Sequence, residues 1–292
     1  MRLVKPKAEL LPWFSGIEGI YKTIELAGRT CYKSESKITE GSAKPFVDRM
    51  INSSHYAMLE HGTVYLFIAN TGNDSLYFNK YSDNKYSKVQ YDKLGYVYVT
   101  TNFRVLVEND WLDDLKYLCD PTEYHEMRYS FKLITSIGVT REMNRHRVNS
   151  IAEMSTRYCN YSKEKFNNQV SFCIPEWLAI EEQEVTVRDL QKTLAKSLSV
   201  NEYFFLSKLL SDEKSYMILS QHGWQPQQAR EVLPLCTATE IVHTAFASDW
   251  KHFFDLRLFG KTGAPHPNMK QLAELMKIEA EKQGVWEDIM KV

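Results

Sequence analysis

REMNRHRVNSIAEMSTRY, residues 141–158, is the densest cluster of charged and hydroxyl side chains in the chain. We expect a helix over about 138–147 that places Arg141 and Arg145 one turn apart on one face, followed by a Ser-rich loop. Guanidinium groups pair bidentately with anionic oxygens, and each charge-assisted hydrogen bond contributes about 1.5–3 kcal/mol. The stretch therefore predicts a surface for phosphate and a planar pyrimidine edge. The alternative is a solvated basic face with salt bridges to Glu142 and Glu153.

Three other segments carry charged residues beside apolar runs. They are His55-x4-Glu60-His61 before a predicted strand, QAREVLP at 228–234 around Arg230, and FFDLR at 253–257 ending on Arg257. Each also has a structural explanation. The two histidines could bind zinc, although their spacing is not HExxH, and Arg230 could cap its own short helix. Ser248, His252 and Asp255 could be a solvent-facing polar stripe.

Arg145-His146-Arg147, seven residues and then Ser155 resemble the RHR-x7-S signature of the flavin-dependent thymidylate synthase family. The three outlying segments resemble that family's HxxxxEH, ARxxLP and FxxLR motifs, in the same order along the chain. The resemblance runs from about residue 16 to 285 and leaves about 70–128 uncovered. It implies one domain over residues 1–292 with an insertion at about 70–128.

The resemblance implies the reductive methylation of dUMP to dTMP, with methylenetetrahydrofolate as carbon donor, NADPH as reductant and FAD as cofactor. It also implies a homotetramer whose active sites are shared between subunits. The implied dUMP contacts are Glu142, Arg145, Glu153, Ser155, Thr156, Arg157, Arg230 and Arg257. The implied FAD contacts are His55, Ala57, Glu60, Arg145, His146, Arg147, Val148, Glu153, Phe246, Ser248 and His252. Arg257 is the implied catalytic group, stabilising negative charge on the uracil ring. No metal is expected.

Several positions depart from the family pattern. Ala57 stands where a hydroxyl residue is frequent, Glu142 where Gln is, and Ala152 where Asn is. Phe246 and His252 replace asparagines that often meet the flavin. His266-Pro267-Asn268 stands where His and Gln are more usual. Ser155 has no adjacent base and is therefore assigned to substrate binding, not to nucleophilic attack.

Hydrophobic periodicity predicts a mixed α/β (α+β) domain, and the lack of a GxGxxG motif after a strand argues for a non-Rossmann fold. The family resemblance implies that its sheet is mainly antiparallel and flanked by helices. We expect an exposed irregular excursion over 70–93. The expected strands are 63–69, 96–100, 129–136, 170–174 and 238–245. The expected helices are 16–28 closed by Gly28, 44–58, about 102–118, 138–147, 185–211, a short turn from Pro226, 247–258 and 267–283.

The chain of 292 residues is 43% hydrophobic and 25% charged, with a net charge of -1, which argues against a generic nucleic-acid coat. Its five scattered cysteines indicate reduced thiols, and the sequence has no signal-peptide pattern or apolar run of membrane-spanning length. We therefore expect a cytoplasmic protein with no nucleic-acid or membrane partner. The rival hypotheses are an RNA- or nucleotide-binding module built on the arginine cluster, and a family member that has lost its activity.

Overall fold

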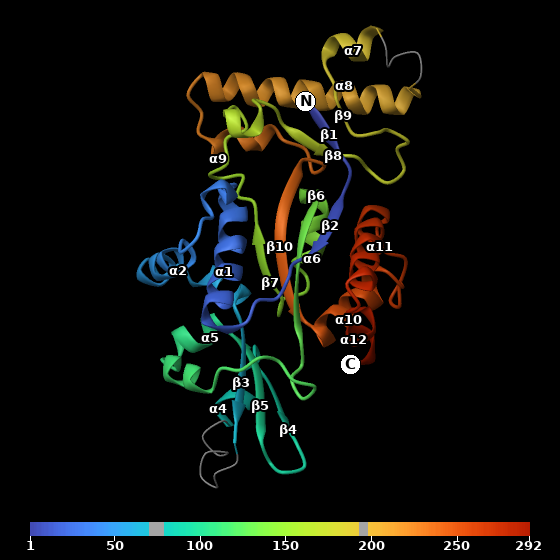
Figure 1. Cartoon of the computed structure of the whole chain (residues 1–292). Helices are drawn as coiled ribbons and strands as arrows, with labels where there is room; N and C mark the ends of the chain where they lie inside the picture. The colour runs from blue at the N-terminus through green and yellow to red at the C-terminus, as the bar shows by residue number, and fades with distance from the viewer. Residues whose placement is uncertain (70–78, 193–197) are drawn as a thin grey trace.

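Three sheets follow one another along the length of the molecule in the computed structural model, which describes residues 1–69, 79–192 and 198–292 (Figure 1). The central sheet has the strand order β2-β6-β10-β7, and the other two are β3-β5-β4 and β8-β1-β9. Every pair in the first two sheets is antiparallel. The predicted mixed α/β fold with mainly antiparallel sheets is confirmed. Among the described residues, no helix is both long and apolar enough to cross a membrane.

Both faces of the central sheet are packed, because apolar side chains along β6 and β10 point alternately to one face and the other. Its strands are β2 (Lys7–Leu10), β6 (Arg128–Ser136), β7 (Ser150–Glu153) and β10 (Ala238–Phe246). Successive side chains of a strand point to opposite faces. Ile241 therefore packs toward one hydrophobic cluster, together with Phe131 and Leu133, while Val242 packs toward another.

Helices cover both faces of this sheet, with α1 on one side and α10 and α11 on the other (Figure 1). The helices of this layer are α1 (Gly16–Tyr32), α2 (Ala43–Asn52), α6 (Ile137–Met143), α10 (Ala247–Arg257), α11 (Pro267–Lys282) and α12 (Trp286–Lys291). The prediction that Gly28 closes the first helix is wrong. A Cβ at Gly28 would lie 2.4 Å from the Phe46 ring, so this glycine allows close packing of α1 on α2. The helix ends at Tyr32, and the next residue, Lys33, adopts the left-handed conformation.

The sheet β3-β5-β4 holds most of the described part of the predicted insertion. Its elements are β3 (Thr63–Ile68), α4 (Asn79–Ser82), β4 (Lys88–Tyr91), β5 (Val97–Asn102), α5 (Phe103–Glu108) and η3 (Leu112–Tyr117). Residues 70–78 of the predicted excursion lie outside the described residues, and the rest is not irregular because β4 pairs with β5. The single helix expected at 102–118 is also wrong, because Asp110 has a φ of 58° and separates α5 from η3.

The third sheet and the long helix α8 form the end of the molecule that carries the N-terminus (Figure 1). The elements here are β1 (Arg2–Val4), β8 (Ser171–Cys173), β9 (Gln183–Glu184), α7 (Val187–Lys192), α8 (Val200–Gln221), α9 (Pro226–Ala229) and η6 (Arg230–Val232). The helix expected over 185–211 is divided. Residues 193–197 lie outside the described residues, and α8 begins at a Ser199–Glu202 capping box and runs to Gln221.

Two local predictions around the arginine cluster are wrong, and both affect the site. Helix α6 ends at Met143, so Arg145 lies in the turn beyond it and does not share a helical face with Arg141. The expected Ser-rich loop begins instead as strand β7, paired with β10. Side chains alternate between buried and half-buried from Ser150 to Glu153. This alternation covers only four residues between charged ones, so the sequence alone does not indicate a strand here. Three short elements complete the chain: η1 (Glu35–Lys37), η2 (Tyr56–His61) and η4 (Glu164–Phe166).

Candidate active site

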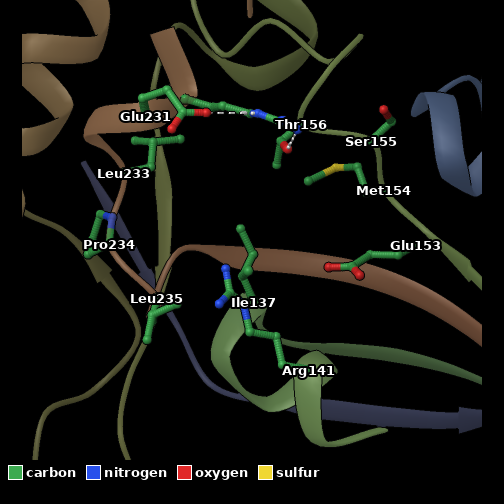
Figure 2. A pocket seen from close by; sticks show the side chains of 11 residues that line it. Ile137, Arg141, Glu153, Met154, Ser155, Thr156, Glu231, Leu233, Pro234 and Leu235 are labelled. Atoms are coloured by element: carbon green, nitrogen blue, oxygen red, sulfur yellow. Dashed lines mark hydrogen bonds and ion pairs between the residues drawn. The ribbon is translucent and has the colours of Figure 1, made fainter. Parts of the chain in front are cut away.

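A cleft of about 530 Å³ opens between α6, the end of β7 and the turn that follows α9 (Figure 2). It brings together parts of two sequence motifs, because Thr156 and Arg230 both line it and are 74 residues apart. The lining of the cleft consists of Ile137, Arg141, Glu153, Met154, Ser155, Thr156, Arg230, Glu231, Leu233, Pro234 and Leu235. The size of the cleft lies in the range of small-molecule sites, and its mixture of a few polar groups with an apolar wall is typical of them.

We call this cleft the nucleotide cleft, and its main polar groups are two arginines and two hydroxyls. Arg230 donates through Nη1 to Thr156 Oγ1 at 3.2 Å and lies 3.5 Å from the carboxylate of Glu231. Its side chain therefore reaches into the cleft and does not cap its own helix. The guanidinium of Arg141 is exposed and has no hydrogen-bond or ion-pair partner in the described part of the chain. The arrangement leaves cationic donors available to an anionic ligand.

Glu153 is one of two acidic residues that line the nucleotide cleft, the other being Glu231. Burial raises the pKa of its carboxyl group, while a hydrogen bond from Thr140 Oγ1 at 3.1 Å and the charge of Arg141 act in the opposite direction. The residue pairs with Ile241 across β7 and β10, which fixes its place on the sheet. A raised pKa makes the carboxyl group of Glu153 easier to protonate than an exposed glutamate.

A second, smaller pocket of about 270 Å³ lies where the turn after α6 meets α10, and we call it the RHR pocket. It is lined by Arg145, His146, Arg147, Val148, Asn149, Asp249, His252, Leu256 and Arg257. The guanidinium groups of Arg145 and Arg147 are exposed and have no side-chain partner among residues 1–69, 79–192 and 198–292. Two unpaired guanidinium groups two residues apart suit a ligand with more than one anionic oxygen.

Arg257 is held at the wall of the RHR pocket by three interactions. Its Nη1 donates to Glu142 Oε2 at 3.0 Å, its Nη2 to the Glu142 carbonyl at 3.1 Å, and its Nε to His146 Nε2 at 3.3 Å. Burial first, and then the charges of Arg257 and His252, lower the pKa of His146 to about 4. His146 is therefore neutral at pH 7 and can accept the hydrogen bond from Arg257.

The other predicted contacts lie outside these two pockets. Arg157 donates to Gln227 at 3.1 Å, and Ser248 donates its backbone N–H to Glu126 at 3.0 Å. His55 and Ala57 are exposed around η2, and Glu60 forms an ion pair with Arg104 at 2.6 Å. Phe246 is buried. His61 bonds Thr244 Oγ1 at 2.9 Å. Among the described residues, no three histidine, cysteine or carboxylate side chains are grouped so that they could hold a metal ion.

One chain therefore divides the predicted site in two. Glu153, Ser155, Thr156 and Arg230 line the nucleotide cleft, whereas Arg145, His146, Arg147, Val148, His252 and Arg257 line the RHR pocket. The family resemblance implies that Arg257 and Arg230 contact the same substrate, and a single chain does not bring them together.

Arg128 is the residue of this region that the sequence reasoning missed. It is 6% exposed, and its guanidinium group donates to the Glu60 carbonyl, Thr63 Oγ1 and Ser150 Oγ, each at 3.2 Å. It also lies 5.2 Å from the centroid of the Phe246 ring. The sequence does offer one indication of this role, because Arg128 stands at the start of the apolar strand β6. A charged side chain in such a position needs buried hydrogen-bond partners.

The fold and the two arginine-bearing pockets define a mixed α/β protein suited to anionic ligands. The chain matches the model of the family described as thymidylate synthase complementing protein over residues 97–283, which is more than half of its length. It belongs to this family. The match begins inside the segment at about 70–128 that the sequence marks as an insertion, and the insertion stays a prediction.

Two relatives carry the name flavin-dependent thymidylate synthase. The protein from Thermosipho africanus (strain TCF52B) is 27% identical over 140 residues, which are 47% of this chain and 57% of the relative. The protein from Pyrococcus furiosus is 29% identical over 119 residues, 41% of each chain. The chain thus spans about half the length of the curated relatives it matches.

Two solved structures are similar along almost the whole chain. The UMP/dUMP methylase PolB from Streptomyces cacaoi bound with 5-Br dUMP has 16% identity and a TM-score of 0.44, covering 100% of this chain and 97% of that one. Thymidylate Synthase X from Helicobacter pylori with FAD and dUMP has 17% identity and a TM-score of 0.41, covering 98% and 100%.

Proposed function

We propose that this protein is a flavin-dependent thymidylate synthase that converts dUMP to dTMP. Methylenetetrahydrofolate would donate the carbon, and NADPH would reduce the bound FAD. The family match and the names of the two curated relatives support this proposal. The observation that carries it is the nucleotide cleft, where Arg141, Arg230 and the hydroxyls of Ser155 and Thr156 surround a space large enough for a nucleoside monophosphate.

In this proposal the nucleotide cleft binds dUMP. Arg230 and Thr156, already joined by a hydrogen bond, would hold the phosphate, with Ser155 beside them. Arg157 would join them after exchanging its bond to Gln227 for one to the nucleotide. Glu153 lines the cleft, where its raised pKa would let it hold or release a proton at the pyrimidine ring.

The RHR pocket is the proposed place for FAD. Its donor set fits the cofactor, because the exposed, unpaired guanidinium groups of Arg145 and Arg147 match the diphosphate of a dinucleotide. When bound, the flavin would supply hydride transfer to the pyrimidine ring. His146, Val148 and His252 would contact the cofactor from the same pocket. His55, Ala57, Glu60, Phe246 and Ser248 stay predicted contacts from neighbouring segments.

Arg257 would stabilise the negative charge that develops on the uracil ring. In the free chain its guanidinium group is engaged with Glu142 and His146. Binding of dUMP would exchange the 3.0 Å contact with Glu142 for one with the ring, while neutral His146 keeps the arginine oriented. Glu142 would thus assist substrate binding by positioning Arg257.

We further propose a homotetramer in which the RHR pocket of one subunit meets the nucleotide cleft of another. This arrangement supplies what one chain lacks, namely Arg257 and Arg230 at the same substrate. Five free cysteines fit a reducing compartment, and we propose a cytoplasmic location.

The test is turnover by the purified protein. Oxidised protein should show a flavin absorption band near ~450 nm, as the cofactor requires. With dUMP, methylenetetrahydrofolate and NADPH it should form dTMP, and omission of any one should stop product formation. A colourless protein that instead binds RNA with steep salt dependence would favour the nucleic-acid-binding alternative. A flavin-loaded protein without product would contradict the enzymatic proposal.

A further inference from the structure

A third cavity, of about 190 Å³, lies on the face of the central sheet that carries α1, beyond the C-terminal end of that helix. The first strands of the chain, the end of α1, the loop at 161–169 and strand β10 all contribute to its wall. We call it the lysine cavity, after Lys7, Lys33 and Lys165 in its lining. None of its polar side chains takes part in the proposed thymidylate reaction. Met154 lines both this cavity and the nucleotide cleft, so the two share a wall.

Positive charge is in excess in the lysine cavity. Its lining includes the cations Arg2, Lys7, Lys33 and Lys165 but the single carboxylate Glu240. Glu240 forms an ion pair with Lys33, and outside the lining Glu182 lies 3.3 Å from Lys7. Lys165 donates to the Tyr32 carbonyl at 3.1 Å, and its ammonium group lies 5.2 Å from the centroid of the Phe166 ring. No carboxylate in the described part of the chain forms an ion pair with Lys165 or Arg2, although the charge of Arg2 helps to lower the pKa of Glu182. Two cations are therefore left for a ligand.

A buried hydroxyl without a partner lies beside these cations. Tyr161 is 2% exposed and lines the cavity, and its hydroxyl has no hydrogen bond in the described structure. The ring is fixed by Phe166 and Tyr216, whose centroids lie 5.1 and 5.4 Å away. An unsatisfied buried hydroxyl costs about 1–3 kcal/mol, so native structures rarely keep one without a ligand or water. Burial also raises the pKa of Tyr161, and the hydroxyl keeps its proton to donate.

We propose that the lysine cavity binds a small oxyanion, a phosphate group, between Lys165, Arg2 and the Tyr161 hydroxyl. The cavity, of about 190 Å³, has room for a phosphate group. The phosphate group would be a free ion or the end of a short phosphate ester. Because Met154 forms the common wall, an anion bound here touches a residue that also lines the nucleotide cleft.

Equilibrium dialysis with labelled inorganic phosphate tests the proposal on the intact protein. Lys165→Gln should weaken one class of bound phosphate by about tenfold or more, because a charge-assisted hydrogen bond is lost. Tyr161→Phe should weaken the same class by about fivefold, and it removes only a hydroxyl that has no partner in the described part of the protein. Lys163→Gln is the matched control, because Lys163 is exposed on the same loop and does not line the cavity.

A second arm separates the two sources of the phosphate group. Displacement by glycerol phosphate indicates a phosphate ester, and resistance to it indicates the free ion; either result with the expected variant effects supports the site. Equal phosphate binding by wild type, Lys165→Gln and Tyr161→Phe would overturn the proposal. A triple variant with Arg141→Gln, Arg145→Gln and Arg147→Gln gives a further check. If it lost all phosphate binding, the proposal would also be overturned, because the phosphate would then bind only in the nucleotide cleft and the RHR pocket.

Discussion

Arg257 is the single residue on which the proposed chemistry depends most. Arg257→Ala should lower kcat by about 10²–10³-fold, the usual cost of removing one donor to a developing anion. FAD absorption and dUMP affinity should change much less, because Arg145, Arg147 and Arg230 remain. Steady-state kinetics with a flavin spectrum of each preparation checks this. Arg188→Ala, an exposed arginine on α7, serves as control. Normal turnover by Arg257→Ala would remove this residue from the mechanism.

Arg128 should contribute strongly to the stability of the fold, because its buried guanidinium group joins three segments of the chain. Arg128→Met removes donors to one carbonyl and two hydroxyls and leaves the Glu60 carbonyl short of a partner. We expect a loss of about 2–4 kcal/mol in the free energy of unfolding. Arg128→Lys should lose less, because it keeps the cation near Phe246. Urea denaturation measures both, and a Met variant within about 0.5 kcal/mol of wild type would show that Arg128 is not a structural clamp.

The identity of the arginine cluster is readable from the sequence, but its geometry is not. The spacing of Arg145, His146 and Arg147 from Ser155 identifies all four, yet the structure places the first three in the RHR pocket and Ser155 in the nucleotide cleft. The contact of Glu142 with Arg257 joins residues that are far apart in the chain, and no local pattern indicates it. The same holds for Arg128, whose partners come from η2, β3 and β7.

At the scale of elements, the packing of η2 on α1 sets the base of the sheet β3-β5-β4. Gly62, directly after η2, has no room for a side chain, because a Cβ would lie 2.6 Å from Ile24 and 2.7 Å from Ile20. Gly62→Ala should therefore cost about 1–3 kcal/mol through overpacking. Gly138→Ala in α6 is the matched control. Its nearest neighbour would be at 3.4 Å, and alanine favours a helix by up to about 1 kcal/mol.

Thermal or urea unfolding of both alanine variants gives the comparison. If Gly62→Ala were as stable as Gly138→Ala, α1 and η2 would not be in the close contact described. The sequence does not indicate this contact, since Gly62 looks locally like the start of a strand and Gly28 like the end of a helix. Both glycines serve packing between elements, which depends on the whole fold. Long, regularly alternating strands such as β6 and β10 are predictable because periodicity is a local property.

At the scale of the whole molecule, buried neutral histidines should make the fold sensitive to acid. Burial lowers the pKa of His61 to about 3 and of His146 to about 4, and that of His243 well below its usual value. Between about pH 4 and 6.5 the unfolded chain binds more protons at these sites, so stability rises with pH, by up to about 1.4 kcal/mol per pH unit for each histidine.

Urea denaturation at several pH values between 5 and 7 should show this slope. The raised pKa of Glu153 acts in the opposite direction, so a Glu153→Gln variant should show a steeper dependence. His243→Asn should flatten it, because one of the three groups is removed. A stability that is constant from pH 7 to 5 would show that these histidines are not held neutral.

The assembled molecule carries the central claim, which is that the nucleotide cleft of one subunit and the RHR pocket of another form one active site. Arg230→Ala impairs the first and Arg257→Ala the second, so each variant alone should be inactive. After co-expression, random pairing of subunits leaves about one intact partner combination in four, and activity should return to about a quarter of wild type. Two inactive variants that stay inactive when co-assembled would contradict the shared site.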